Sequence, residues 1–146
     1  MEIILKNLQK KIPIPKVRIL SVAKAAFHKL GLGAWGLSIA FVGARRMRTL
    51  NKGYLGHDYV TDVLTFDLGG NQGEIIICPE AAHKNAKEYH SSTDSEIILY
   101  VIHGILHLAG YKDHHPKDIQ QMRKMEKELL NIPSPNRWEG SGVLIK

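Results

Sequence analysis

The chain has 146 residues, of which 44% are hydrophobic and 23% charged, and one cysteine. These values are typical of one soluble globular domain and exclude a disordered, collagen-like or membrane-embedded chain. The most apolar segment, residues 97–109, is too short to cross a bilayer and contains two histidines. Because the first residues do not resemble a signal peptide and Cys78 cannot form an internal disulfide, we expect a cytoplasmic protein.

The formal net charge is +6, and it is unevenly distributed along the chain. Residues 1–60 carry 11 Lys/Arg against 2 Asp/Glu, which gives +9, whereas residues 61–146 carry 9 against 12, which gives −3. A basic N-terminal part favours an anionic partner such as nucleic acid. The alternative is a basic surface that is only solvated, as in many small soluble proteins.

The hydrophobic pattern predicts strands with helices between them, followed by helices alone. Strands are expected at residues 2–8, 35–42, 60–68 and 74–78, and helices at residues 16–30, 44–54, 79–89, 93–109 and 116–130. The segment from residue 132 is rich in Pro, Gly and Ser, so we expect a loose C-terminal tail over residues 133–146. We therefore predict an α+β fold, in which residues 1–132 form a single layered domain with a sheet of about four strands packed with helices.

His103 and His107 lie four residues apart in a segment that is otherwise apolar. On a helix this spacing places both imidazoles on one face, where they can chelate one metal ion. A helix that is apolar nearly all round belongs in a protein interior, so both rings need polar partners there. A metal ion supplies one such partner. The alternative is that both are ordinary histidines satisfied by neighbouring polar groups.

A third ligand is expected from the loop that follows this helix, which Gly110 ends. His114 is the first candidate, His115 the second, and Asp113 a rival because carboxylates also bind zinc. Three protein ligands with an open fourth position are typical of a catalytic zinc site in a cleft. A metal-bound water is then expected to act as nucleophile or proton donor.

Gly104 follows the first histidine, at the position where HExxH metalloproteases carry their general-base glutamate. Its presence argues against a peptidase of that kind. Glycine in a helix costs about 1 kcal/mol relative to alanine, so we expect a substrate or another backbone to approach Gly104 closely. The GxGxxG match at residues 31–36 follows a helix instead of a strand, which is typical of a connection and not of a nucleotide site.

The histidine segment, HGILHLAGYKDH, resembles HGxLHLxGYDH, the signature of the YbeY family of bacterial endoribonucleases, which are rRNA maturation factors. Residues 50–66 resemble the family stretch LNxxYRGKDxPTDVLSF, and residues 73–77 resemble its GDIxI strand. Residues 125–130 resemble its closing helix, so the resemblance covers about residues 40–132. Linked motifs in the same order are far more specific than any one of them.

The resemblance implies a metal-dependent endoribonuclease that prefers single strands and acts in rRNA maturation and ribosome quality control. It implies one Zn²⁺ per chain, with His103, His107 and His114 as ligands, in a cleft beside a mixed sheet. The implied partners are single-stranded RNA, rRNA and the small ribosomal subunit. No membrane and no nucleotide cofactor are expected.

The chain departs from the family pattern at two positions. Leu55 stands where the family has an arginine regarded as catalytic, and Lys112 is inserted between Tyr111 and Asp113. If the family's spacing is kept, the third ligand is Asp113. If the family's residue type is kept, the third ligand is His114. We favour His114, because a loop absorbs one extra residue more readily than a site changes its ligand type.

Four basic residues of the helix at 44–54 are the expected RNA contacts: Arg45, Arg46, Arg48 and Lys52. Arg48 or Lys52 is a candidate catalytic replacement for the missing arginine. His57 and Asp58 are expected either to shape the cleft or to cap a turn. The alternative function is a non-catalytic ribosome-assembly factor, in which the metal stabilises the fold and the basic surface binds rRNA. A metal-dependent hydrolase of a substrate other than nucleic acid is a third possibility.

Overall fold

The computed structural model describes residues 2–130 and 144–145. The strands are β1 (Glu2–Asn7), β2 (Gly36–Phe41), β3 (Val63–Gly69), β4 (Gln72–Ile77) and β5 (Leu144–Ile145). The helices are α1 (Lys16–Lys29), α2 (Ala44–Leu55), α3 (Pro79–Glu88), α4 (Thr93–Leu108) and α5 (Pro116–Leu130). All predicted strands and helices are therefore present. β3 begins three residues later than expected, because residues 60–62 belong to the loop that follows α2.

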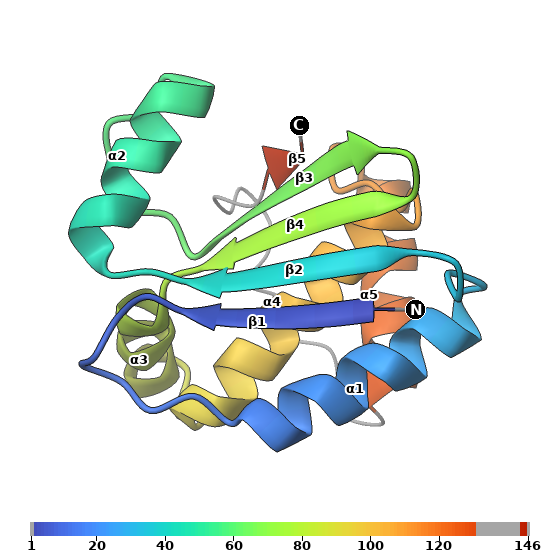
Figure 1. The fold of residues 1–146 in the computed structure, drawn as a ribbon, viewed down its shortest axis with the longest axis horizontal. Coiled ribbons are helices and arrows are strands. Elements are labelled where there is room, and N and C mark those ends of the chain that lie inside the picture. Colours follow the sequence, from blue (N-terminus) through green and yellow to red (C-terminus); the bar gives the residue numbers. More distant parts are fainter. Residues whose placement is uncertain (1, 131–143, 146) are drawn as a thin grey trace.

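The strands form one mixed sheet in the order β1-β2-β4-β3-β5 (Figure 1). β1 and β4 run parallel to β2, whereas β3 runs antiparallel to β4. The prediction of a mixed sheet in an α+β domain is confirmed, and its four longer strands are the four expected ones. β5 adds two residues parallel to β3. It is the part of the predicted C-terminal tail that the structure describes. Residues 131–143 and 146 lie outside the described residues.

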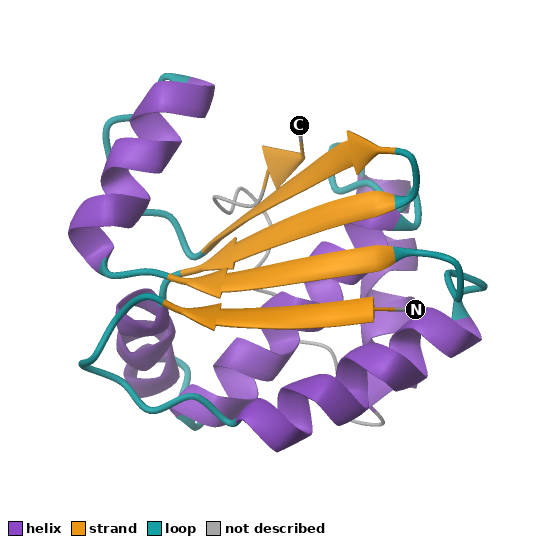
Figure 2. Ribbon diagram, viewed as in Figure 1, coloured by secondary structure: helices purple, strands orange, loops and turns teal. Residues whose placement is uncertain are grey.

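Helices cover the two faces of the sheet unequally (Figure 2). On one face, α4 lies at the centre of the helical layer and contacts α1, α3 and α5 as well as β3 and β4. The opposite face packs against α2, where Met47 is buried in an apolar cluster with Val42, Leu64 and Cys78. Part of that second face stays open, since Leu8 and Leu68 are 52% and 62% exposed.

α4 is the most deeply buried helix in the described part of the chain, and its position follows from its composition. Ser92 caps its first turn by accepting a hydrogen bond from the backbone N–H of Ser95 at 3.1 Å. Every residue from Glu96 to Leu108 is buried, as expected for a helix that is apolar all round.

Gly104 is the point at which α4 lies closest to the sheet. A Cβ atom at this position would lie 2.7 Å from Ile75 Cδ1 and 3.0 Å from Thr65 Oγ1. The close approach expected there is thus made by side chains of β4 and β3, and not by a substrate or another backbone. Glycine fits here because any larger residue must displace side chains that are fully buried in a close-packed interior.

Candidate metal centre

His103 and His107 meet on one face of α4, as the four-residue spacing predicted. Their Nε2 atoms lie 3.2 Å apart, and their residues are 0% and 4% exposed. Both rings are therefore isolated from bulk water, where an unpaired nitrogen would be costly.

The loop after α4 folds back and places the carboxylate of Asp113 beside this histidine pair. Gly110, with φ at +101°, ends the helix, and the N–H of Tyr111 donates back to the carbonyl of Leu106 at 3.0 Å. Asp113 Oδ2 then lies 3.5 Å from His107 Nε2 and 3.9 Å from His103 Nε2. Within the described residues, these three side chains are the group whose ligand atoms lie close enough together, within 4.8 Å, to hold a metal ion.

The orientation of each imidazole is fixed by a partner on its other nitrogen. Nδ1–H of His103 donates to Glu126 Oε2 at 2.9 Å, and Nδ1–H of His107 donates to the carbonyl of Tyr111 at 3.0 Å. Since both partners accept, the ring protons lie on Nδ1 and the Nε2 lone pairs point toward Asp113. Two lone pairs and a carboxylate oxygen repel one another unless a cation lies among them, so the donor set fits a metal ion.

The pKa shifts follow from burial and from the close contacts in the cluster. Burial acts to raise the pKa of Asp113, but hydrogen bonds and charges from His103 and His107 outweigh it and hold that pKa well below its ordinary value. Burial, assisted by repulsion from His103, lowers the pKa of His107. For His103, burial is outweighed by the contacts to Asp113 and Glu126, and its pKa is raised. At neutral pH, Asp113 is therefore ionised and His107 neutral, the forms that bind a metal, whereas a metal at His103 must displace the proton that the raised pKa favours.

The other predicted third ligands lie outside this cluster. His114 and His115 are exposed, and His114 lines a separate hollow of about 470 Å³ with residues of α5, among them Gln120 and Arg123. The structure thus brings Asp113, the rival candidate, to the histidine pair. The inserted Lys112 is exposed, and Asp113 takes the position that the family's spacing gives to the third ligand.

Glu126 was not predicted as a site residue, although it is fully buried on α5 beside His103. A signal was present in the sequence. Glu126 occupies the apolar register of an amphipathic helix, one residue after Met125 and four after the buried Met122. A carboxylate at an inward position needs a buried hydrogen-bonding partner, and His103 is that partner.

The basic residues of α2 divide between two hollows. Arg45, Arg48 and Lys52 line one of about 440 Å³, together with Asp58. Arg48 Nε donates to Asp58 Oδ1 at 2.8 Å, and Lys52 Nζ lies 4.0 Å from Oδ2. The hydrogen bond to Asp58 raises the pKa of Arg48. Asp58 therefore binds the cations of α2.

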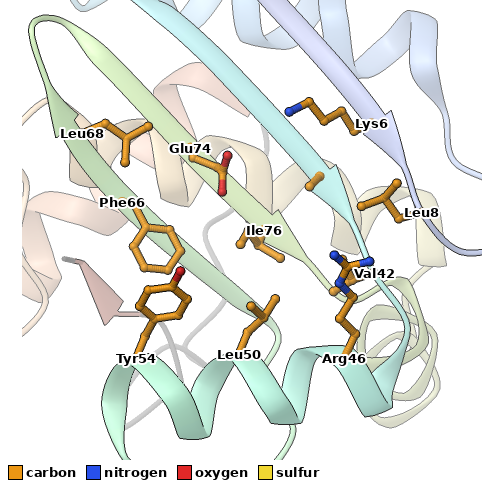
Figure 3. A pocket seen from close by; sticks show the side chains of 11 residues that line it. Lys6, Leu8, Val42, Arg46, Leu50, Tyr54, Phe66, Leu68, Glu74 and Ile76 are labelled. Carbon is orange, nitrogen blue, oxygen red and sulfur yellow. The ribbon is translucent and has the colours of Figure 1, made fainter.

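Arg46 faces the other hollow, a groove of about 290 Å³ between α2 and the open face of the sheet (Figure 3). Tyr54 packs edge-on against Phe66 at a centroid distance of 5.2 Å, and Lys6 and Glu74 also line this groove. Arg46 thus lines a different hollow from the other three basic residues of α2, although all four are exposed on the same helix.

Leu55, at the position of the family arginine, ends α2. It is partly buried and packs against the apolar cluster on the second face of the sheet. No helix in the described residues is both long and apolar enough to cross a membrane.

Comparison with known proteins agrees with this geometry. The family described as endoribonuclease YbeY matches residues 4–133. An endoribonuclease YbeY of Thermotoga neapolitana is 40% identical over 115 residues, which are 77% of this chain and 76% of that protein. One of Alkaliphilus metalliredigens is 32% identical over 143 residues, 88% of this chain and 92% of that protein. The solution structure of a Thermotoga maritima protein, which is 28% identical to this chain, aligns with a TM-score of 0.59. The alignment covers 88% of this chain and 90% of that protein.

Proposed function

Since this chain belongs to the endoribonuclease YbeY family, we propose that it is a metal-dependent endoribonuclease that cleaves single-stranded RNA and acts in rRNA maturation and ribosome quality control. The observation that carries the proposal is the convergence of His103 Nε2, His107 Nε2 and Asp113 Oδ2. Relatives named for the same activity align over most of the chain, and the family match over residues 4–133 spans the positions of this cluster.

The metal that best suits these donors is zinc, one ion per chain. Two imidazole nitrogens and one carboxylate oxygen form a three-ligand set of the kind found in catalytic zinc sites. We assign Asp113 as the third ligand in place of His114, because its oxygen already lies near both Nε2 atoms. When bound, zinc supplies a Lewis acid for a phosphate oxygen and lowers the pKa of a coordinated water.

The chain's own residues hold the reacting groups in place. Glu126 and the carbonyl of Tyr111 keep the two imidazoles oriented with Nε2 toward the shared space. The side chain of Asp113 is 13% exposed, whereas that of His103 is fully buried, so a substrate approaches the cluster from the side of Asp113. The basic residues of α2 attract and hold the phosphates of the RNA strand.

The proposed partners are rRNA and the small ribosomal subunit, and the proposed location is the cytoplasm. The charge of +9 over residues 1–60 supports a polyanionic partner. In the structure this charge includes the exposed residues Arg45, Arg46, Arg48 and Lys52.

A non-catalytic role in ribosome assembly is the second candidate function, and Leu55 is the observation that favours it. A leucine packed against the apolar cluster cannot bind a phosphate. Loss of one preorganised charged donor typically lowers a rate by about 10²–10³-fold. Arg48 and Lys52, both held by Asp58, are the candidates to replace the missing arginine.

Single-turnover cleavage of a labelled single-stranded RNA tests the proposal. We expect cleavage that stops with a chelator, returns with zinc, and is abolished by His107→Ala, which also loses the bound metal. His83→Ala, a change at an exposed histidine of α3, is the matched control and should cleave normally. Metal bound at one ion per chain without any cleavage would favour the assembly factor. Equal metal content in wild type and His107→Ala would refute the site itself.

A further inference from the structure

The loop between α2 and β3 (Figure 1) carries a pair of stacked rings. The rings of His57 and Tyr59 lie 5.4 Å apart between centroids with an interplanar angle of 11°. The Tyr59 hydroxyl lies 3.2 Å from His57 Nδ1, and this hydrogen bond keeps the rings in register. Tyr59 is 49% exposed, so part of an aromatic surface faces solvent.

Buried contacts hold the loop that carries these rings. Asn51, fully buried in α2, donates from Nδ2 to the carbonyl of Tyr59 at 3.0 Å. The backbone carbonyl of Asn51 also accepts from the N–H of His57 at 3.4 Å. Asn51 therefore holds both residues of the pair: His57 through its backbone carbonyl and Tyr59 through its side chain. The pair is rigid before any ligand arrives, which lowers the entropic cost of binding.

Asp58 connects the segment of the ring pair to the cations of α2. Asp58, between the two ring-bearing residues in sequence, binds Arg48 at 2.8 Å and approaches Lys52 at 4.0 Å. These two side chains, with Arg45, line the hollow of about 440 Å³ on α2. An exposed aromatic surface next to a cationic hollow matches a nucleotide, whose base is flat and whose phosphate is anionic.

We propose that the His57–Tyr59 pair is a stacking platform for one unpaired nucleobase of an RNA strand, whose neighbouring phosphates bind the cationic hollow of α2. This inference rests on the proposed function and names the part of the chain that holds the single strand. Leu55 and His57 stand where the related motif YRGKD carries arginine and lysine. The exposed ring pair offers an aromatic contact, which every base can use because every base has a π-face.

Binding of two oligonucleotides of equal length and charge tests the platform. One is a uridine-rich single strand with 2′-O-methyl sugars, and the other has the same backbone without bases. The full chain with its metal is used, and recovered oligonucleotide is checked for cleavage. Wild type should bind the base-bearing strand about 5- to 100-fold more tightly, as stacking on one aromatic ring predicts. Tyr59→Leu should lose most of this preference.

Matched variants separate stacking from other effects. Tyr59→Phe keeps the aromatic surface and should keep the preference, and so should Tyr89→Leu, which changes another exposed tyrosine (44% exposed). The salt dependence of binding should be the same in Tyr59→Leu and wild type, because no phosphate contact is removed. Thermal unfolding of each variant verifies that the fold is intact.

Two negative results have different meanings. If wild type binds and cleaves RNA but Tyr59→Leu keeps the full preference for bases, the platform is refuted while the proposed function stands, and the ring pair becomes a protein-docking or purely structural feature. If wild type binds neither strand at moderate salt, the platform and the proposed function are both refuted. An equal loss of the preference in Tyr89→Leu would show a non-specific effect and would also overturn the platform.

Discussion

Helices α2 and α4 carry the two groups of candidate functional residues in the described structure, and these helices differ most in burial. In α4, thirteen consecutive residues from Glu96 to Leu108 are buried, whereas in α2 only Met47 and Asn51 are. A buried polar group must find a fixed partner, so each histidine of α4 has a hydrogen-bond partner on its Nδ1. The exposed cations of α2 are hydrated, so water can replace a charged partner that they lose.

This difference predicts where sequence changes have large effects. In α4 and the elements around it, each contact is specific and its loss is not replaced by water. In α2, the exposed charges interact over the Debye length, about 8 Å at physiological ionic strength. Because several charges contribute together, we expect a single substitution there to have a modest effect. Substitutions at Glu126, Gly104 and Asp58 test this difference in burial, from the largest expected effect to the smallest.

Glu126→Gln tests whether the buried carboxylate tunes the metal site. The amide can still accept the hydrogen bond from His103, but it removes the negative charge that strengthens this imidazole as a ligand. We expect zinc affinity to fall by about 10- to 100-fold, measured by competition with a chromophoric chelator. Glu128→Gln, on the same helix but 41% exposed and paired with Lys29, should leave the affinity unchanged. Equal affinities for wild type and Glu126→Gln would contradict the role given to Glu126.

Gly104→Ala tests how tightly α4 packs on the sheet. The added methyl group must displace Ile75 and Thr65, which costs about 1–3 kcal/mol and exceeds the gain of about 1 kcal/mol in helix propensity. We expect the free energy of unfolding to fall by up to about 2 kcal/mol in denaturant titrations. Gly53→Ala on α2, where a Cβ meets nothing within 4 Å, should instead stabilise the protein. If both substitutions stabilise the protein, the tight contact at Gly104 is wrong.

Asp58→Asn tests whether the charges of α2 are partly neutralised. Removing this carboxylate releases Arg48 and Lys52 for phosphate binding. The slope of log K against log salt for single-stranded RNA should become steeper, by up to about 0.7 per additional phosphate contact. Asp94→Asn, a change of an exposed carboxylate in the first turn of α4, should leave the slope closer to that of wild type. A shallower slope in Asp58→Asn would show that Asp58 itself supports binding.

Most of the fold could be predicted from the sequence because the strands and helices have strong hydrophobic patterns. α4 is the clearest case, since its apolar residues on every side specify a central helix. The start of β3 was less predictable. Residues 60–62 look like a strand in isolation, but the hydrogen bond from Asn51 to Tyr59 holds the preceding residue in a loop. Such a contact between distant residues leaves no periodic signal.

The candidate site was predictable only as far as one helix carries it. The spacing of His103 and His107 determines their geometry because both lie on α4. The third ligand depends on the path of a loop, and neither spacing nor residue type alone determines that path. Glu126 comes from a different helix, and its position beside His103 depends on how α5 packs against α4.

The most direct test of the account is the zinc affinity of Asp113→Ala compared with that of His114→Ala. These neighbouring residues share the same loop, but only Asp113 reaches the histidine pair. We predict that Asp113→Ala loses more affinity than the ~10- to 100-fold expected for an outer partner of a ligand, and that His114→Ala retains the wild-type value. A large loss in His114→Ala with an unchanged affinity in Asp113→Ala would contradict the proposed metal centre.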